Sequence, residues 1–179
     1  MTRIPQLNNE DAPAFVKRIF KRIEDELGTL PNLYRILGHS PESLNGFLEL
    51  TKNVNAGILE PRLRKAIILL VSELSGCRYC VAMHNKIATF NGIMTSDEAI
   101  LARKGEGWDE PSRAALEFAG EVYRNYGKVP DSAIDGIRQA GFDDAQIVEI
   151  VATIAMINFS NLIGNVAQTE LDSPEAPEI

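Results

Sequence analysis

The sequence has few of the residues that would tie the protein to a metal, a nucleic acid or a membrane. Its 179 residues include two cysteines, two histidines and one tryptophan. Two cysteines cannot make a disulfide framework, and a chain of this length buries enough apolar surface to fold without one. The formal net charge of −7 argues against a nucleic-acid partner, because phosphate binding needs clustered lysines and arginines. The longest apolar run, residues 66–71, is too short to cross a bilayer, and no apolar leader follows Met1. We therefore expect a soluble cytoplasmic protein, in a reducing compartment that leaves both cysteines free for chemistry.

Helical patterns recur along the whole chain, and strand patterns almost never do. Glycine and proline stop signals separate the apolar repeats, and the connections between them are short. These patterns predict one all-α domain over residues 1–179, a helical bundle with frayed ends at 1–9 and 172–179. About eight helices are expected, over residues 15–27, 41–53, 62–74, 76–90, 96–103, 111–122, 130–140 and 145–168.

Two of these helices are more apolar than a small monomer needs. The segment 62–74 is apolar nearly all the way round, as expected of a helix in the middle of a bundle. The segment 145–168 carries a dense series of isoleucines and valines. Because large apolar surfaces on small proteins usually mark interfaces, subunits are expected to pack against each other.

The candidate chemistry lies in residues 73–84, which hold both cysteines, a histidine and a carboxylate. On a helix, Cys77 and Cys80 are three residues apart and Cys80 and His84 four, so two sulfurs and an imidazole share one face. A free cysteine has a pKa of about 8.5, and its thiolate is the reactive form. A position in the first turn of the helix favours a thiolate at Cys77, while His84 can accept the proton of the Cys80 thiol and return it to a leaving oxygen. This arrangement predicts dithiol redox chemistry.

Three other interpretations of the cysteines compete with redox chemistry. A zinc site needs four ligands, and His39 is the only other histidine that could join the set. Covalent haem attachment needs a histidine immediately after the second cysteine, whereas His84 comes four residues later. The pair could also be inert cysteines on a core helix, since free cysteine is often buried. No metal and no other cofactor is therefore expected.

The segment around the cysteines resembles a known family. The arrangement CxYCxxxH of residues 77–84, after an apolar helix and before Asn91-Gly92, is similar to the core of the alkylhydroperoxidase D-like, carboxymuconolactone decarboxylase superfamily. The segments 28–34 and 158–161 also resemble its peroxidase-related branch. The resemblance implies an all-helical fold that assembles into homotrimers or homohexamers. Carboxymuconolactone decarboxylases themselves lack the CxxC pair, which argues against the lactone reaction for this chain.

The resemblance also implies roles for individual residues. In the family's peroxidases the second cysteine of the pair attacks the peroxide and the first resolves it, which implies these roles for Cys80 and Cys77; the helix dipole alone would favour Cys77 as the nucleophile. His84 matches the relay histidine. The family's glutamate lies twelve residues before the first cysteine, where this chain has Lys65, and Glu73 is the candidate substitute carboxylate.

The function expected from the sequence is thus a thiol-dependent peroxidase that reduces hydrogen peroxide or an organic hydroperoxide. An external dithiol must return the oxidised pair, and the family precedent is a dihydrolipoamide-bearing protein. Two alternatives remain open: a disulfide reductase or redox relay that never meets peroxide, and a non-catalytic oligomer whose CxxC senses oxidation.

Overall fold

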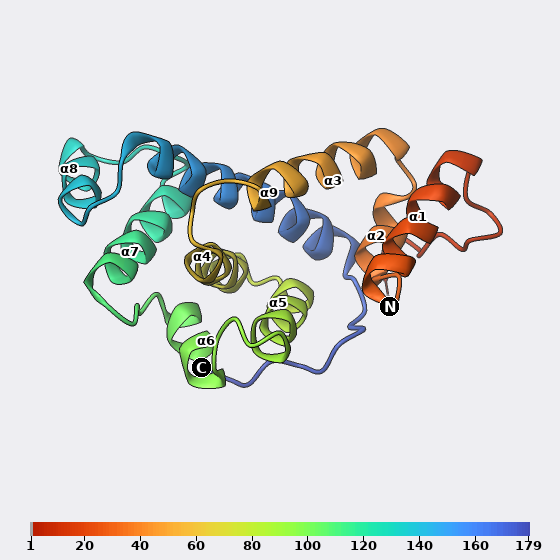
Figure 1. The fold of residues 1–179 in the computed structure, drawn as a ribbon. Coiled ribbons are helices and arrows are strands. Elements are labelled where there is room, and N and C mark those ends of the chain that lie inside the picture. The colour runs from red at the N-terminus through yellow and green to blue at the C-terminus, as the bar shows by residue number, and fades with distance from the viewer. Residues whose placement is uncertain (1) are drawn as a thin grey trace.

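The structure, a computed structural model, describes residues 2–179, and this range forms nine α-helices and no strand. Figure 1 shows their arrangement along the chain. The prediction of an all-α fold is thereby confirmed. The helices are α1 (Ala14–Leu27), α2 (Asn32–Leu37), α3 (Pro41–Asn55), α4 (Pro61–Leu74), α5 (Arg78–Phe90), α6 (Ser96–Lys104), α7 (Glu110–Arg124), α8 (Asp131–Gln139) and α9 (Asp144–Ala167).

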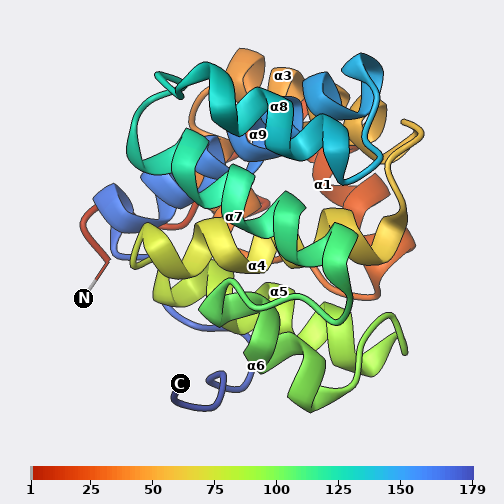
Figure 2. The same cartoon turned by 90° about the vertical axis from the view of Figure 1, so that its left-hand side faces the viewer.

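Helix α4 lies at the centre of the fold, where it packs against α5, α6, α7 and α9 (Figure 1). Figure 2, turned by 90°, shows α6 and α3 at opposite edges with α4 and α5 between them. Ile67, Leu69 and Val71 of α4 are completely buried, which explains why this helix is apolar nearly all the way round.

A second apolar core joins the N-terminal helices to the cysteines. Val16 and Phe20 of α1, with Leu44 of α3, belong to one buried cluster that also contains Cys77 and Cys80. The N-terminal third of the chain is therefore the cover of the cysteine pair, and it shields the sulfurs from solvent.

Two local features differ from the sequence expectation. Helix α2 was not predicted, because six residues are too few to show an apolar period. Helix α5 begins at Arg78 and not at residue 76, since Gly76 adopts a left-handed conformation with φ 63° that breaks the helical path.

Both ends of the described chain, which were expected to fray, are held by hydrogen bonds. The backbone N–H of Arg3 donates to the carbonyl of Ala167 at 2.7 Å. At the other end the carboxylate of Asp172 accepts a bond from the backbone N–H of Asn32 at 2.6 Å. After α9 the chain runs beneath α5 and ends beside α6 (Figure 1).

Helix α9 combines a buried face with an exposed apolar stripe. By length and composition this helix could cross a membrane, yet half of its most apolar stretch is buried inside the fold. Val148, Val151, Leu162 and Val166 are 43–66% exposed. Their spacings of 3, 11 and 4 residues are close to one, three and one helical turns, so they lie on one face of the helix. The stripe is the kind of surface that subunits cover in an oligomer.

Candidate active site

The cysteine segment is shaped by the break between α4 and α5. Gly76 turns the chain in its left-handed conformation, and the N–H of Cys77 donates to the carbonyl of Ser72 at 3.1 Å. Cys77 is the N-cap residue of α5, where its Sγ accepts the backbone N–H of Cys80 at 3.3 Å. The sulfur of Cys77 thus lies at the positive end of the helix dipole, which stabilises a thiolate there.

The two cysteines form a disulfide across this first turn, with their Cα atoms 5.3 Å apart. Both are buried, with 1% of Cys77 and 2% of Cys80 exposed. Gly164 of α9 packs against the pair: a Cβ at this position would lie 2.9 Å from the Sγ of Cys77 and 3.6 Å from the Sγ of Cys80. Because glycine has no side chain, α9 can approach the two sulfurs at residue 164.

Two asparagines of α9 bind the end of α4 and so fix the site. The buried Asn161 accepts a hydrogen bond from the hydroxyl of Ser72 at 3.3 Å. Its amide lies 3.4 Å from the carbonyl of Val71, to which it donates. One turn later Asn165 donates to the carbonyl of Ser75 at 2.8 Å. These bonds anchor the residues just before Cys77, which explains the presence of a polar stretch in an otherwise apolar helix.

His84 lies one turn beyond Cys80 on α5 and contacts Lys65 of α4. The Nζ of Lys65 lies 3.5 Å from the Nδ1 of His84. Burial, and then the neighbouring Lys65, lower the pKa of His84 well below its ordinary value. Burial, and then Arg64, lower the pKa of Lys65 to about 8. The imidazole is consequently neutral at pH 7, while Lys65 is the charged partner.

A small apolar cavity opens between the N-terminal helices and α5, and both Cys80 and His84 line it. Its volume is about 110 Å³. Within it the hydroxyl of Thr51 is buried without a hydrogen-bond partner. Cys77 is absent from the lining, so Cys80 is the cysteine that faces the cavity. The other walls are Leu27, Pro31, Leu33, Tyr34, Phe47, Tyr79, Met83, Ile87, Met156, Ile157 and Ser160.

The two residues between the cysteines are both bound by the C-terminal tail. The hydroxyl of Tyr79 donates to the carboxylate of Asp172 at 2.9 Å. Burial, and then the charge of Asp172, raise the pKa of Tyr79. Arg78 donates to the carboxylate of Glu175 at 2.6 Å on the surface. The tail thereby covers the outer side of the disulfide, a contact that no local sequence pattern signals.

Glu73 is held away from this cavity. Its carboxylate accepts a hydrogen bond from the guanidinium of Arg103 at 2.8 Å, and the Arg103 side chain is only 5% exposed. The structure thus brings Cys80, Cys77 and His84 together and turns Glu73 toward α6. A catalytic role for Glu73 stays a prediction, with its ion pair as the competing structural role.

Residues 2–179 hold no group of three His, Cys, Asp or Glu side chains that could bind a metal ion.

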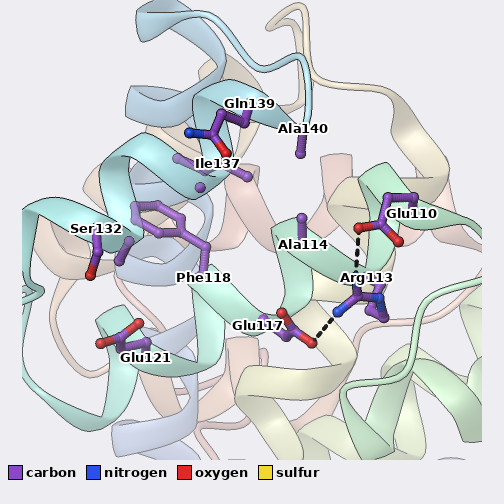
Figure 3. A pocket seen from close by; sticks show the side chains of 12 residues that line it. Glu110, Arg113, Ala114, Glu117, Phe118, Glu121, Ser132, Ile137, Gln139 and Ala140 are labelled. Atoms are coloured by element: carbon purple, nitrogen blue, oxygen red, sulfur yellow. Dashed lines mark hydrogen bonds and ion pairs between the residues drawn. The ribbon is translucent and has the colours of Figure 1, made fainter.

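A second concave region, a groove of about 420 Å³, lies between α7 and α8 (Figure 3). There Arg113 bridges the carboxylates of Glu110 and Glu117, at 2.6 and 2.7 Å. Arg113 is thus held by two of the groove's three glutamates, and Glu121 forms no ion pair within the described residues.

The arrangement of helices is the alkylhydroperoxidase D-like fold. A peroxidase-related protein from Ralstonia eutropha JMP134, described as an alkylhydroperoxidase AhpD core, superposes with a TM-score of 0.86 at 23% identity. The match covers 96% of this chain and 92% of that one. It extends the likeness seen in residues 77–84 to nearly the whole fold.

Sequence comparison agrees with the fold. The sequence model of the Carboxymuconolactone decarboxylase family matches residues 41–120. The uncharacterized protein YdfG of Bacillus subtilis (strain 168) is 27% identical over 131 residues, covering 69% of this chain and 86% of YdfG. The debrominase Bmp8 is 26% identical, with a TM-score of 0.80 over 96% of this chain and 93% of Bmp8. These likenesses agree with the resemblance of residues 77–84 to the alkylhydroperoxidase D-like, carboxymuconolactone decarboxylase superfamily.

Proposed function

We propose that the protein is a thiol-dependent peroxidase that reduces peroxides through the Cys77–Cys80 pair. The observation that carries the proposal is that Cys80 and His84 line one cavity while Cys77 does not. A cysteine that meets the substrate, a second cysteine within disulfide reach and a titratable group beside the first are the parts that such a cycle needs. The geometry therefore favours Cys80 as the nucleophile, in agreement with the family precedent and against the dipole argument for Cys77.

The cycle balances without a metal or prosthetic group. The Cys80 thiolate attacks one peroxide oxygen, the O–O bond breaks, and Cys80 becomes a sulfenic acid while the leaving oxygen takes a proton as water or alcohol. The thiol of Cys77 then attacks the sulfenic sulfur, and water leaves as the disulfide forms. An external dithiol, such as a dihydrolipoamide-bearing protein, reduces the disulfide again. We place this cycle in the cytoplasm, in a homotrimer or homohexamer.

The cavity supports an organic hydroperoxide as substrate. Its 110 Å³ has room for several water molecules, since roughly 10–15 Å³ of such space holds one. Hydrogen peroxide would leave most of the apolar wall without a contact. A hydroperoxide with a compact apolar group would fill it, and the unpaired hydroxyl of Thr51 offers one hydrogen bond to its polar end.

Peroxide consumption by the purified reduced protein, with dithiothreitol or dihydrolipoamide supplied, tests the proposal. Cys77→Ser should react once and stop at a sulfenic acid that a dimedone-type reagent traps. Cys80→Ser should react far more slowly. His84→Ala should slow the first step by roughly two to four powers of ten, the usual contribution of a positioned acid or base. Slow, equal reaction of both cysteine variants would refute the proposal and leave the redox relay or the sensor.

A second candidate function is reductive dehalogenation of a small aromatic compound. Bmp8 is a debrominase, and a cysteine-to-alanine variant of it was crystallised with 2,3,4-tribromopyrrole. In this chain the aromatic rings of Phe47 and Phe159 stack at 5.5 Å, and Phe47 lines the cavity. In that reaction the dithiol gives up two electrons and becomes a disulfide, the carbon–halogen bond becomes a carbon–hydrogen bond, and halide leaves. Halide release from a bromopyrrole, with one disulfide formed per halide, would establish it.

A further inference from the structure

The contact between Lys65 and His84 determines which ring nitrogen of the histidine carries the proton. An ammonium group has only donors, so Lys65 must donate to Nδ1, which then presents its lone pair. The neutral imidazole consequently carries its hydrogen on Nε2. A carboxylate in the place of Lys65 would accept a hydrogen bond from Nδ1–H and leave the lone pair on Nε2. The two partners thus give the histidine opposite roles: donor with lysine, base with a carboxylate.

The charged groups around Lys65 leave it as the hydrogen-bond donor to His84. Arg64 is its charged neighbour on α4, and His84 faces it from α5. The carboxylates of Glu73 and Glu98 lie in ion pairs with arginines. Within residues 2–179, no acidic side chain from α5, α6, α7 or α9 forms an ion pair with Lys65. Lys65 therefore keeps its positive charge beside His84, which lines the cavity together with Cys80.

We propose that Lys65 is the proton source of the site and passes its proton through His84 to the group that leaves when Cys80 is oxidised. The inference rests on the proposed peroxidase function. As the thiolate of Cys80 attacks and the O–O bond breaks, Nε2–H of His84 protonates the leaving oxygen. Nδ1 takes a proton from the Lys65 ammonium in the same step, so the imidazole stays neutral throughout. Lys65 becomes an amine and regains its proton from solvent before the next turnover.

This relay fits the electrostatics of the pair. The lowered pKa of His84 means that the imidazole cannot supply the proton by first becoming charged. The pKa of Lys65, about 8 beside the disulfide, makes its ammonium a better acid than a surface lysine while keeping it protonated at pH 7. A thiolate at Cys80 raises the pKa of Lys65, because an opposite charge favours the ammonium. Lys65 is accordingly a positioning and proton-relay residue that acts through His84.

The test compares Lys65→Met, Lys65→Arg and Lys65→Glu with wild type, and the exposed Lys86→Met on α5 is the matched control. Circular dichroism and thermal melting confirm that each variant is folded. The rate of peroxide reduction is measured from pH 5 to 10 with dithiol in excess. In parallel, the apparent thiol pKa of Cys80 is measured by iodoacetamide alkylation in the Cys77→Ser background, which needs no peroxide.

For the rates, wild type should lose activity at alkaline pH as Lys65 loses its proton, at a pH above the value of about 8 that Lys65 has beside the disulfide, because the thiolate raises it. Lys65→Arg should keep the charge but lose the relay, because a guanidinium does not give up its proton, so this variant should be as slow as Lys65→Met and show no alkaline limb. Lys65→Met should be slower by about a hundredfold, the low end of the range for a positioned acid–base group. Lys65→Met and Lys65→Glu should also raise the thiol pKa of Cys80, whereas Lys65→Arg and Lys86→Met should leave it unchanged.

Three results would separate the inference from the function it rests on. Peroxide reduction by wild type that is unchanged in Lys65→Met across the pH range would overturn the relay and leave the peroxidase standing. No peroxide reduction by wild type would refute the peroxidase, and the alkylation data would then decide on Lys65 alone. In that case an unchanged thiol pKa in Lys65→Met would overturn the inference, and a raised one would support its charge acting on Cys80.

Discussion

Replacing Gly164 by alanine should destabilise the protein, although the same change elsewhere in a helix stabilises it. Gly164 lies within α9, where alanine is favoured over glycine by about 0.8–1.0 kcal/mol. The new Cβ would, however, lie 2.9 Å from the sulfur of Cys77, closer than carbon and sulfur can pack. Because α9 is tied to α4 by the hydrogen bonds of Asn161 and Asn165, the helix cannot move away freely.

The size of the effect follows from these opposing terms. Overpacking of a filled core costs about 1–3 kcal/mol, so the net loss for Gly164→Ala is roughly 0–2 kcal/mol. Gly46→Ala is the matched control, since Gly46 is an exposed residue within α3 whose Cβ would meet nothing within 4 Å. That variant should gain about 1 kcal/mol. The two substitutions should therefore differ by about 1–3 kcal/mol.

Thermal and urea unfolding of the oxidised and reduced protein measure this difference. For a domain of this size 1 kcal/mol corresponds to a shift in Tm of about 2–4 °C. Reduction separates the two sulfurs, which then need more room, so Gly164→Ala should destabilise the dithiol more than the disulfide. A Gly164→Ala protein as stable as Gly46→Ala in both states would refute the close approach of α9 to the sulfurs.

Three further predictions concern other parts of the molecule. Glu73→Gln should lower the free energy of unfolding by about 1–3 kcal/mol, because it leaves the buried charge of Arg103 without its partner; an altered alkylation rate of Cys80 in this variant would instead support a catalytic role for Glu73. By light scattering at micromolar concentration the wild-type protein should run as a multiple of 19.7 kDa, and Leu162→Glu on the exposed stripe of α9 should shift it toward the monomer. Chelator should leave the helical circular dichroism unchanged, since the apolar core does not depend on the cysteines; unfolding on chelation would establish a structural metal.

Local patterns predicted most of the helices because each carries its own start and stop signals. Thr95, Asp109 and Asp143 accept capping hydrogen bonds at the first turns of α6, α7 and α9. Residue spacing alone also placed Cys80 one turn before His84 on α5, whereas Cys77 caps the helix and does not line the cavity that the other two share. These features can be predicted without knowing which residues pack against them.

Features that depend on residues distant in the sequence could not be predicted from it. The tail bond from Asp172 to Tyr79 joins residues 93 positions apart. The hydrogen bonds of Asn161 and Asn165 span about 90 positions. Gly164 lies inside an apolar helix where no local pattern calls for a glycine, and only the packing of α9 on the cysteines explains it. These contacts are set by the way the helices pack, which no local pattern encodes.

Lys65 shows how burial changes the acid–base properties of a side chain. As a residue in a sequence it is an ammonium with an ordinary pKa, unable to act as a base. In the fold it is half-buried beside a neutral histidine, and burial lowers its pKa to about 8. The same histidine that sequence reasoning assigned as a proton acceptor for Cys80 then presents its donor nitrogen to the site, because Lys65 occupies the other nitrogen. A single side chain on α4 thereby sets the direction in which protons travel at Cys80. Peroxide reduction can use this direction, since the thiolate exists before the attack and the leaving oxygen needs a proton only afterwards.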